Sequence, residues 1–549
     1  MYMEIPGTGI TAWVADETDR LTDNYPCAYT DFWGSRIPCV YKTGSLWPAL
    51  TPAYCGYWRS RIVREARPVY GHPISPSWLS TGQKICDVLD HHRIKWTSVD
   101  PLAFADAEEA EPLCPLLIYI GVLPRSLPYD DAVVIAGTVK EILADTGHPD
   151  VEVALAESLY RGSSRERKWD PLDMMYDFLD DHLALCKPFT ATLGIPIAPL
   201  GDPQREGTGA LYYRIGAGDR ERIVLLTCAH VVCLDGCAGQ AECSARQEVI
   251  APGEQAFKDG LEHIQDIIND SSRRIRNAEA NLHELGHHIE GEPIRTTEKR
   301  ELMRNMIKWE TARIEEANTL RDTVKTTRSR PEERVIGSVL HVERNDAPAE
   351  AYGYPRDFAL VEMYKEKMDW STFHGNKVFI GDNLTSNQFR RALFPQGYAH
   401  GQYPNDGLLQ ARGIVTDDEF RNPQGLDKYN KKCLLVVKTG ALTGTTVGRV
   451  NGLESFTRIY DDHGAHHTST QFAVLCLERN ITHFSCFAEQ GDSGSIVLTG
   501  DGRIVGLLTG GAGPSESPYN AVSYITPYWW VEQQIKTKFP DCSLYDGPR

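Results

Sequence analysis

Residues 254–329 carry an apolar pattern that long helices satisfy and strands do not. Apolar side chains recur there at spacings of three, four and seven on a strongly charged background: Phe257, Leu261, Ile264, Ile268, Ile275, Leu282, Leu285, Leu302, Met306, Trp309, Leu320 and Val324. Residues at these spacings share one face of a helix. Because Gly291-Glu292-Pro293 separates the two sets, the segment predicts a hairpin of two long amphipathic helices, antiparallel and coiled-coil-like.

The sequence on both sides of this hairpin has the texture of a β-domain. Short apolar runs at 190–198, 209–214 and 222–227 are separated by Gly, Pro and Asp, as strands and turns require. The same texture returns from Val335 and ends in a helical pattern at 527–538. We therefore predict one β-domain over residues 186–549, interrupted by a helical hairpin insertion over residues 254–329.

Residues 1–185 predict a separate α/β domain. The continuous apolar run at 115–123 suits a buried strand, 130–145 has helical spacing, and 150–156 alternates like a further strand. This order predicts a β-α-β unit with two parallel strands. Residues 80–92 predict another helix and 95–99 another strand. No phosphate-binding loop or metal-spaced cluster is visible here, so we expect a regulatory or pro-domain.

Composition excludes several classes of partner. The 549 residues include 57 Lys and Arg against 75 Asp and Glu, a formal net charge of −18. Such a chain is unsuited to a phosphate backbone, because basic side chains supply nucleic-acid affinity. No apolar run is long enough to cross a membrane, and the N-terminal residues lack the pattern of a signal peptide. We expect a cytoplasmic protein without nucleic-acid or membrane partners, whose 14 cysteines stay reduced.

Three segments of the β-domain resemble the catalytic motifs of one peptidase family. Leu226-Thr-Cys-Ala-His230 ends an apolar strand, Asp357-Phe-Ala-Leu-Val opens one, and Gly491-Asp-Ser493-Gly precedes one. In this chain order they are similar to the His, Asp and Ser segments of chymotrypsin- and trypsin-fold serine peptidases. The resemblance covers about residues 189–540 without the hairpin, and it implies a chymotrypsin-like double β-barrel.

The resemblance also implies a reaction. Ser493 would attack a peptide bond of a protein or peptide substrate and form an acyl-enzyme, with His230 as general base and Asp357 orienting the imidazole. The backbone N–H groups of Gly491 and Ser493 would form the oxyanion hole. No cofactor or metal is implied.

The same alignment suggests substrate-binding residues. Phe487 lies where trypsins keep an Asp at the base of the specificity pocket, which disfavours a basic side chain before the scissile bond. Thr509, Gly510 and Gly511 would form the wall strand that pairs with substrate backbone, and Asn520 would lie on the far wall. Residues 436–450 resemble a glycine-rich barrel segment beside the cleft, which we interpret as structural.

The chain departs from the family pattern at two places. Val231 stands where secreted members carry a disulfide-bonded Cys, in line with a reducing compartment. No Ile-Val-Gly-Gly segment lies near residue 189, so the usual partner of Asp492, a new N-terminus released by cleavage, has no source. A side chain or a backbone group has to take that place, and whether activation requires cleavage stays open.

Alternatives to a serine peptidase remain at this stage. The chain could be a catalytically inactive peptidase-fold scaffold that binds partners through the N-terminal domain and the hairpin. His283-Glu284-Leu-Gly-His287 is a literal zinc-peptidase string, which would place two imidazoles on one helical face. We also expect the hairpin to project and to self-associate or dock a partner through its Leu261/Ile264/Ile268 and Leu302/Met306/Trp309 faces.

Overall fold

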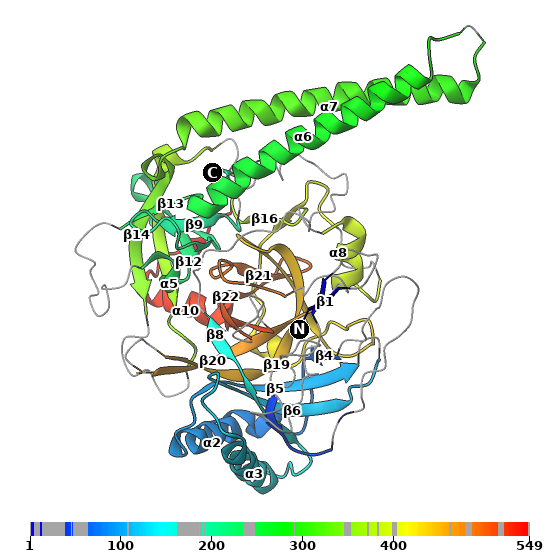
Figure 1. Ribbon diagram of the computed structural model, residues 1–549. Coiled ribbons are helices and arrows are strands. Elements are labelled where there is room, and N and C mark those ends of the chain that lie inside the picture. Colours follow the sequence, from blue (N-terminus) through cyan, green and yellow to red (C-terminus); the bar gives the residue numbers. More distant parts are fainter. Residues whose placement is uncertain are drawn as a thin grey trace.

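The computed structural model shows a multidomain protein of α-helices and large β-sheets (Figure 1). It describes residues 2–4, 11–13, 39–45, 47, 64–106, 109–161, 186, 189–190, 193–233, 247–289, 291–344, 353–370, 373–381, 384–397, 403–460, 464, 466–477, 486–513 and 521–546. The described helices are α2 (Trp78–His91), α3 (Tyr129–Asp145), α5 (Ala229–Val232), α6 (Glu254–Glu284), α7 (Ile294–Thr327), α8 (Ser386–Leu393), α9 (Asp417–Arg421) and α10 (Tyr528–Lys538). Short 3-10 turns are η1 (Ser75–Ser77), η4 (Gly218–Arg220), η5 (Pro331–Arg334) and η6 (Lys365–Lys367).

A closed ring of six antiparallel strands forms the C-terminal half of the β-rich region. The strands are joined in the order β18-β21-β22-β23-β20-β19 and back to β18. Their bounds are β18 (Leu434–Gly440), β19 (Gly444–Tyr460), β20 (His466–Cys476), β21 (Ile496–Thr499), β22 (Ile504–Gly513) and β23 (Val522–Pro527). Apolar side chains from these strands, among them Val436, Phe472 and Ile525, form a core within the ring.

An eight-stranded sheet lies beside the ring, in the order β10-β9-β13-β14-β15-β12-β11-β24. Its strands are β9 (Pro196–Pro199), β10 (Gly207–Thr208), β11 (Tyr212–Ile215), β12 (Arg222–Thr227), β13 (Glu248–Ile250), β14 (Val335–Glu343), β15 (Phe358–Met363) and β24 (Ser543–Leu544). Two-stranded sheets join β1 (Tyr2–Glu4) to β2 (Thr11–Trp13) and β16 (Lys377–Phe379) to β17 (Leu408–Gln410). One hydrophobic cluster contains both Leu225 of the eight-stranded sheet and Leu507 of the ring, so the two units share a core.

The described residues between 39 and 161 fold as an α/β unit, as the apolar pattern predicts. Its strands are β3 (Cys39–Lys42), β4 (Arg64–Arg67), β5 (Trp96–Asp106), β6 (Cys114–Val122), β7 (Glu152–Glu157) and β8 (Leu159–Arg161). β6 and β7 are parallel and α3 connects them, so the predicted β-α-β unit is present. Helices α2 and α3 cover one face of this sheet (Figure 1). The opposite face packs against the ring through residues such as Phe104 and Tyr524.

The boundary between the two predicted domains is bridged by main-chain pairing. β5 pairs antiparallel with β19, with Val99 opposite Phe456, so the N-terminal strands extend the sheet of the ring. The tyrosine hydroxyl of Tyr524 on β23 also donates to the buried carboxylate of Asp100 on β5 at 3.0 Å. Burial raises the pKa of Asp100 to about 6, although hydrogen bonds to its carboxylate oppose that shift. The α/β unit is therefore attached to the ring through both backbone and buried polar contacts.

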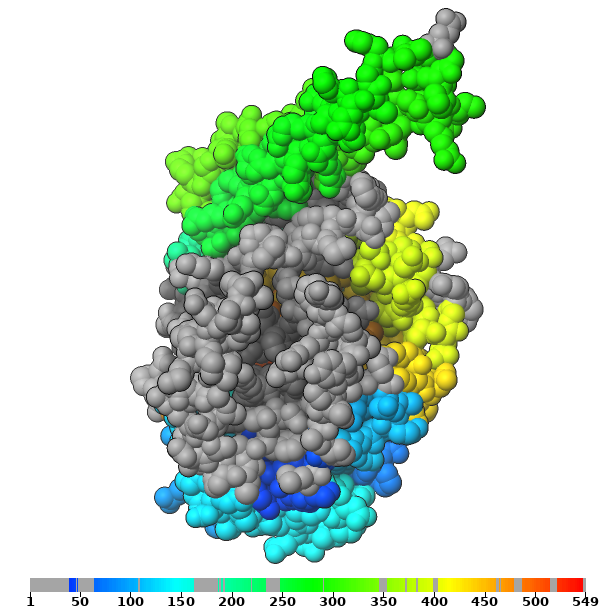
Figure 2. Space-filling view, turned by 45° about the vertical axis from the view of Figure 1, so that its right-hand side comes forward, coloured from blue at the N-terminus to red at the C-terminus, as the bar shows by residue number. Residues whose placement is uncertain are grey.

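Helices α6 and α7 form the long hairpin that the apolar spacing predicts. They connect neighbouring strands β13 and β14 and project from the body (Figures 1 and 2). The 31 residues of α6 span roughly 46 Å at ~1.5 Å per residue. Arg274 of α6 pairs with the buried Glu310 of α7 at 3.1 Å, and Arg321 donates to Gln265 at 3.1 Å. These polar contacts fix the register in which α6 and α7 pack antiparallel.

Only one of the two proposed docking faces is exposed. Ile264 is 0% exposed, and Leu261 and Ile268 belong to the cluster that packs α6 against α7, so that face serves the hairpin itself. On the second face Leu302 and Trp309 are 59% and 47% exposed, whereas Met306 is half-buried. The docking prediction is therefore restricted to the Leu302/Trp309 face.

Two further expectations concern the described part of the chain. No helix found there combines the length and apolar character needed to cross a membrane. The cysteines described there are not joined by disulfides.

Replacing Leu302 and Trp309 together by serine tests the docking face. If this face holds two chains together, the molar mass measured by light scattering should fall toward that of a monomer, because the replaced side chains supply the apolar contact. Trp370→Ser is the control, because Trp370 is 46% exposed but lies outside the hairpin. An unchanged mass in the double variant would contradict self-association through this face.

Candidate functional site

His230 and Asp357 meet where strand β12 ends and its neighbour β15 begins, inside the eight-stranded sheet. Strands β12 and β15 are antiparallel neighbours, with Thr227 opposite Ala359. The residues that follow Thr227 therefore lie beside those that precede Ala359. Helix α5 begins at Ala229, shortly after β12 ends, and carries His230 on its first turn.

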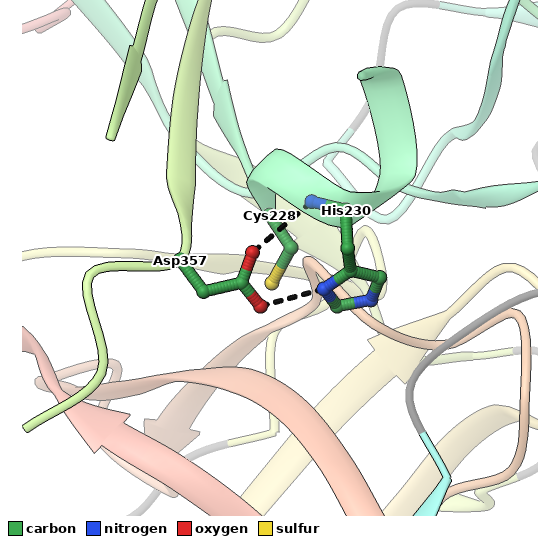
Figure 3. Close-up of side chains that lie close together, drawn as sticks. All are labelled: Cys228, His230 and Asp357. Carbon is green, nitrogen blue, oxygen red and sulfur yellow. Dashed lines mark hydrogen bonds and ion pairs between the residues drawn. The ribbon is translucent and has the colours of Figure 1, made fainter. Parts of the chain in front are cut away.

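Two hydrogen bonds hold His230 to the carboxylate of Asp357 (Figure 3). The backbone N–H of His230 donates to Asp357 Oδ1 at 3.0 Å, and His230 Nδ1 lies 2.6 Å from Oδ2. Burial alone would raise the pKa of Asp357, but His230 and its hydrogen bonds hold that pKa below the ordinary value. An ionised Asp357 favours the proton on Nδ1, so the basic lone pair of the imidazole lies on Nε2, the atom that can accept a proton.

Ser493 lies in a tight turn that precedes β21. Gly491 and Gly494 have φ values of 105° and 91°, a region that favours glycine. Ser493 is 3% exposed, and its hydroxyl donates to the carbonyl oxygen of Thr509 at 3.3 Å. Within the described part of the chain, the N–H groups of Gly491 and Ser493 donate to no other group, whereas the N–H of Asp492 donates to Glu489. Two unused donors therefore flank Asp492.

Leu508 and Thr208 each form hydrogen bonds both to the serine turn and to the residues just before His230. The carbonyl of Leu508 on β22 accepts from Gly494 N–H at 2.8 Å and from the Cys228 thiol at 3.2 Å. Thr208 makes a second bridge: its N–H donates to the carbonyl of Ser493, and its carbonyl accepts from the Thr227 hydroxyl, both at 2.8 Å. The segments of His230 and Ser493 therefore border the same junction between the two sheets.

Gly494 is needed for this close approach. A Cβ added there would lie 2.1 Å from the carbonyl oxygen of Thr208, which is backbone and cannot move aside easily. Any larger residue would separate the serine turn from Thr208.

A buried ion pair fixes the centre of the serine turn. Lys438 on β18 lies 3.0 Å from Asp492 Oδ2, and both side chains are 0% exposed. The carboxylate of Asp492 also accepts from the hydroxyl of Thr443 at 2.6 Å and from the N–H groups of Leu442 and Glu489 at 2.9 and 3.1 Å. Burial alone would raise the pKa of Asp492, but Lys438 and these donors hold it below the ordinary value.

Lys438 thus supplies the side-chain partner for Asp492 that the sequence left open. We interpreted residues 436–450 as structural, and the role of Lys438 was missed. The only clue in the sequence was that the apolar segment 434–440 contains a single lysine, because a pairing across 54 positions leaves no spacing pattern.

The predicted substrate-binding residues do not all lie beside Ser493. Thr509, Gly510 and Gly511 lie on the buried strand β22, and Thr509 contacts Ser493. Phe487 is 1% exposed and packs in the ring core near Val474, so its place at a pocket base stays a prediction. Asn520 lies outside the described residues.

The zinc-peptidase string does not form the expected helical face. Helix α6 ends at Glu284, and Gly286 has a φ of 65°, so His283 and His287 do not share one continuous helix. The sequence pattern was misleading because glycine terminates the helix inside the motif. In the described ranges, three metal-ligating side chains converge only at Cys228, His230 and Asp357.

Cys228 is buried beside this pair (Figure 3). Burial, reinforced by nearby Asp357, raises the pKa of its thiol well above the ordinary value. The neutral thiol therefore acts here as a donor to Leu508 rather than as a thiolate.

Lys438→Met should destabilise the protein severely. Removal of one partner leaves the carboxylate of Asp492 buried without its cation, which typically costs about 3–5 kcal/mol of unfolding free energy. Lys431→Met is the control, because Lys431 and Glu111 form a 2.7 Å pair whose side chains are 50% and 77% exposed; such a pair contributes about 0–1 kcal/mol. Equal losses in the two variants, measured by urea denaturation, would refute the importance of the buried pair.

Acid should abolish the contribution of Asp492. Because its folded pKa lies below the unfolded value of about 3.9, its stabilisation is fully present above that pH and is lost as pH falls through the folded pKa. The difference in unfolding free energy between the wild type and Asp492→Asn should therefore be largest near neutral pH and shrink in acid. A difference that does not change between about pH 7 and pH 3 would contradict this assignment.

Comparison with known protein families identifies no match: no family model fits this chain. Any functional assignment therefore rests on the chemistry of the site itself. The site contains an imidazole hydrogen-bonded to a carboxylate, a buried serine in a turn held by an ion pair, and two N–H donors of that turn without an acceptor among the described residues.

Proposed function

We propose that the protein is a serine peptidase of the chymotrypsin-like type, with His230, Asp357 and Ser493 as its catalytic triad. The observation that carries the proposal is the pair of hydrogen bonds between His230 and Asp357, formed at the same sheet junction as the Ser493 turn. The six-stranded ring carries the serine and the eight-stranded sheet carries the histidine and aspartate, which is in keeping with two β-units contributing to one site.

The groups support acyl transfer in two stages. The Ser493 oxygen attacks the substrate carbonyl carbon while its proton passes to Nε2 of His230, and the N–H groups of Gly491 and Ser493 bind the resulting oxyanion. Collapse breaks the C–N bond, and the same imidazole returns the proton to the leaving amine. Water then attacks the acyl-enzyme with His230 again as base, which releases the acid and restores the serine.

Each neighbouring group has a role in this scheme. Asp357 orients the imidazole and stabilises its protonated form. The Lys438–Asp492 pair holds the turn so that the two N–H groups keep their direction without a newly cleaved N-terminus. The enzyme therefore needs no cleavage to assemble this turn.

A fluorophosphonate probe tests the proposal. It should label Ser493 of the full-length protein, as located by mass spectrometry, and labelling should be lost in Ser493→Ala. His230→Ala and Asp357→Asn should lower turnover by orders of magnitude, about 10⁴-fold for the aspartate by analogy with the general triad.

Ser495→Ala is the matched control, because Ser495 is a buried serine of the same turn whose hydroxyl donates to the carbonyl of Asp492. It should retain labelling. Absence of labelling and of turnover on a peptide library, together with partner binding that Ser493→Ala does not alter, would instead favour the inactive scaffold.

A further inference from the structure

The substrate-pairing strand β22 already has a partner from the N-terminal unit. β8 pairs antiparallel with the end of β22, with Arg161 opposite Gly511, Tyr160 opposite Ala512 and Leu159 opposite Gly513 (Figure 1). Gly511 is one of the residues expected to pair with substrate backbone. An extended segment of this chain therefore occupies part of the edge that a peptide substrate would use.

Tyr160 anchors this strand in a formed site. Its ring stacks on Tyr524 with centroids 5.6 Å apart and an interplanar angle of 16°. Its hydroxyl accepts from Gln471 Nε2 at 3.2 Å. Gln471 and Tyr524 are 1% and 0% exposed, so the residues that hold the Tyr160 ring belong to the protein interior. Tyr160 itself is only half-buried.

Gly510 makes room for the anchor. A Cβ added at Gly510 would lie 2.7 Å from the hydroxyl oxygen of Tyr160 and 2.9 Å from the carbonyl oxygen of Arg161. A side chain at this position would therefore displace β8. The absence of a side chain is a feature of a site that accepts a neighbouring strand and an aromatic ring.

A chain of contacts connects the anchor to the serine. Gln471 Oε1 accepts from the Thr509 hydroxyl at 2.5 Å, and the Thr509 carbonyl accepts from the Ser493 hydroxyl at 3.3 Å. The tyrosine site is thus separated from the nucleophile by two residues. A ligand bound there would contact Gln471, which is connected to Ser493 through Thr509.

We propose that β8 is an internal peptide ligand of β22, anchored by Tyr160, and that it restrains the enzyme by competing with an extended substrate that places a tyrosine in the same site. Strand addition draws its affinity from main-chain hydrogen bonds and its specificity from alternate side chains, here a single tyrosine. The three residues of β8 form a short strand, which a longer peptide can displace. The effect on turnover rests on the proposed function, whereas the pairing does not.

Full-length Tyr160→Ala tests the inference by hydrogen exchange and by the labelling rate of Ser493. Loss of a stacked aromatic anchor should speed amide exchange in residues 511–513 and raise the labelling rate about three- to tenfold. Tyr160→Phe keeps the stacking and should lie between the wild type and Tyr160→Ala. Tyr129→Ala, at the start of α3 in the same unit, should behave as the wild type.

A synthetic peptide supplies the second measurement. Acetyl-Ser-Leu-Tyr-Arg-amide added to Tyr160→Ala should restore slow exchange in residues 511–513 and reduce labelling, whereas the same peptide with Ala in place of Tyr should do neither. If Tyr160→Ala does not fold, excess peptide added to the wild type should displace β8 and speed exchange in residues 159–161.

The outcomes separate this inference from the proposed function. Unchanged exchange in Tyr160→Ala, or a peptide without effect on exchange, overturns the internal ligand. Slower labelling of Tyr160→Ala overturns the restraint, because β8 would then support the site. Absence of labelling in every variant overturns the peptidase assignment, and the exchange data still decide whether β8 is a displaceable ligand.

Discussion

A carboxylate removed from water stays ionised only where cations and donors replace its hydration, and Asp492 meets that requirement inside the serine turn. Lys438 neutralises it, and backbone and hydroxyl donors occupy its remaining lone pairs. The residues on either side of Asp492 consequently have little freedom. The direction of the two unused N–H groups and the position of the Ser493 hydroxyl both depend on this one interaction.

Long-range pairing then determines where that turn lies. The contacts of Thr208 and Leu508 hold the turn against the end of β12, and the shared hydrophobic cluster holds the ring against the eight-stranded sheet. The N-terminal unit continues the ring's sheet through β5 and reaches the site through β8. What the sequence presents as a separate domain thus pairs with β22, the strand whose Thr509 carbonyl accepts from the serine hydroxyl.

Features with a strong local pattern could be predicted from the sequence, and features made by distant residues could not. The hairpin and the β6-α3-β7 unit were predictable because their periodicity extends over many residues. His230 and Asp357 were predictable as neighbours only through family resemblance. The pairing of Lys438 with Asp492, 54 positions apart, leaves no spacing signal. The same is true of β8, whose three residues are too few for any periodicity.

The hairpin also bears on how such a chain finds its fold. The strands β13 and β14 that must pair are separated by a long insertion, and closing a loop of that length costs entropy. The contacts between α6 and α7 can form one after another from the turn of the hairpin outward, and the completed hairpin holds Glu254 within 2.6 Å of Arg334, next to the start of β14. Once the two helices have paired, the ends of β13 and β14 are already close in space. The insertion therefore lengthens the polypeptide without lengthening its slowest search in proportion.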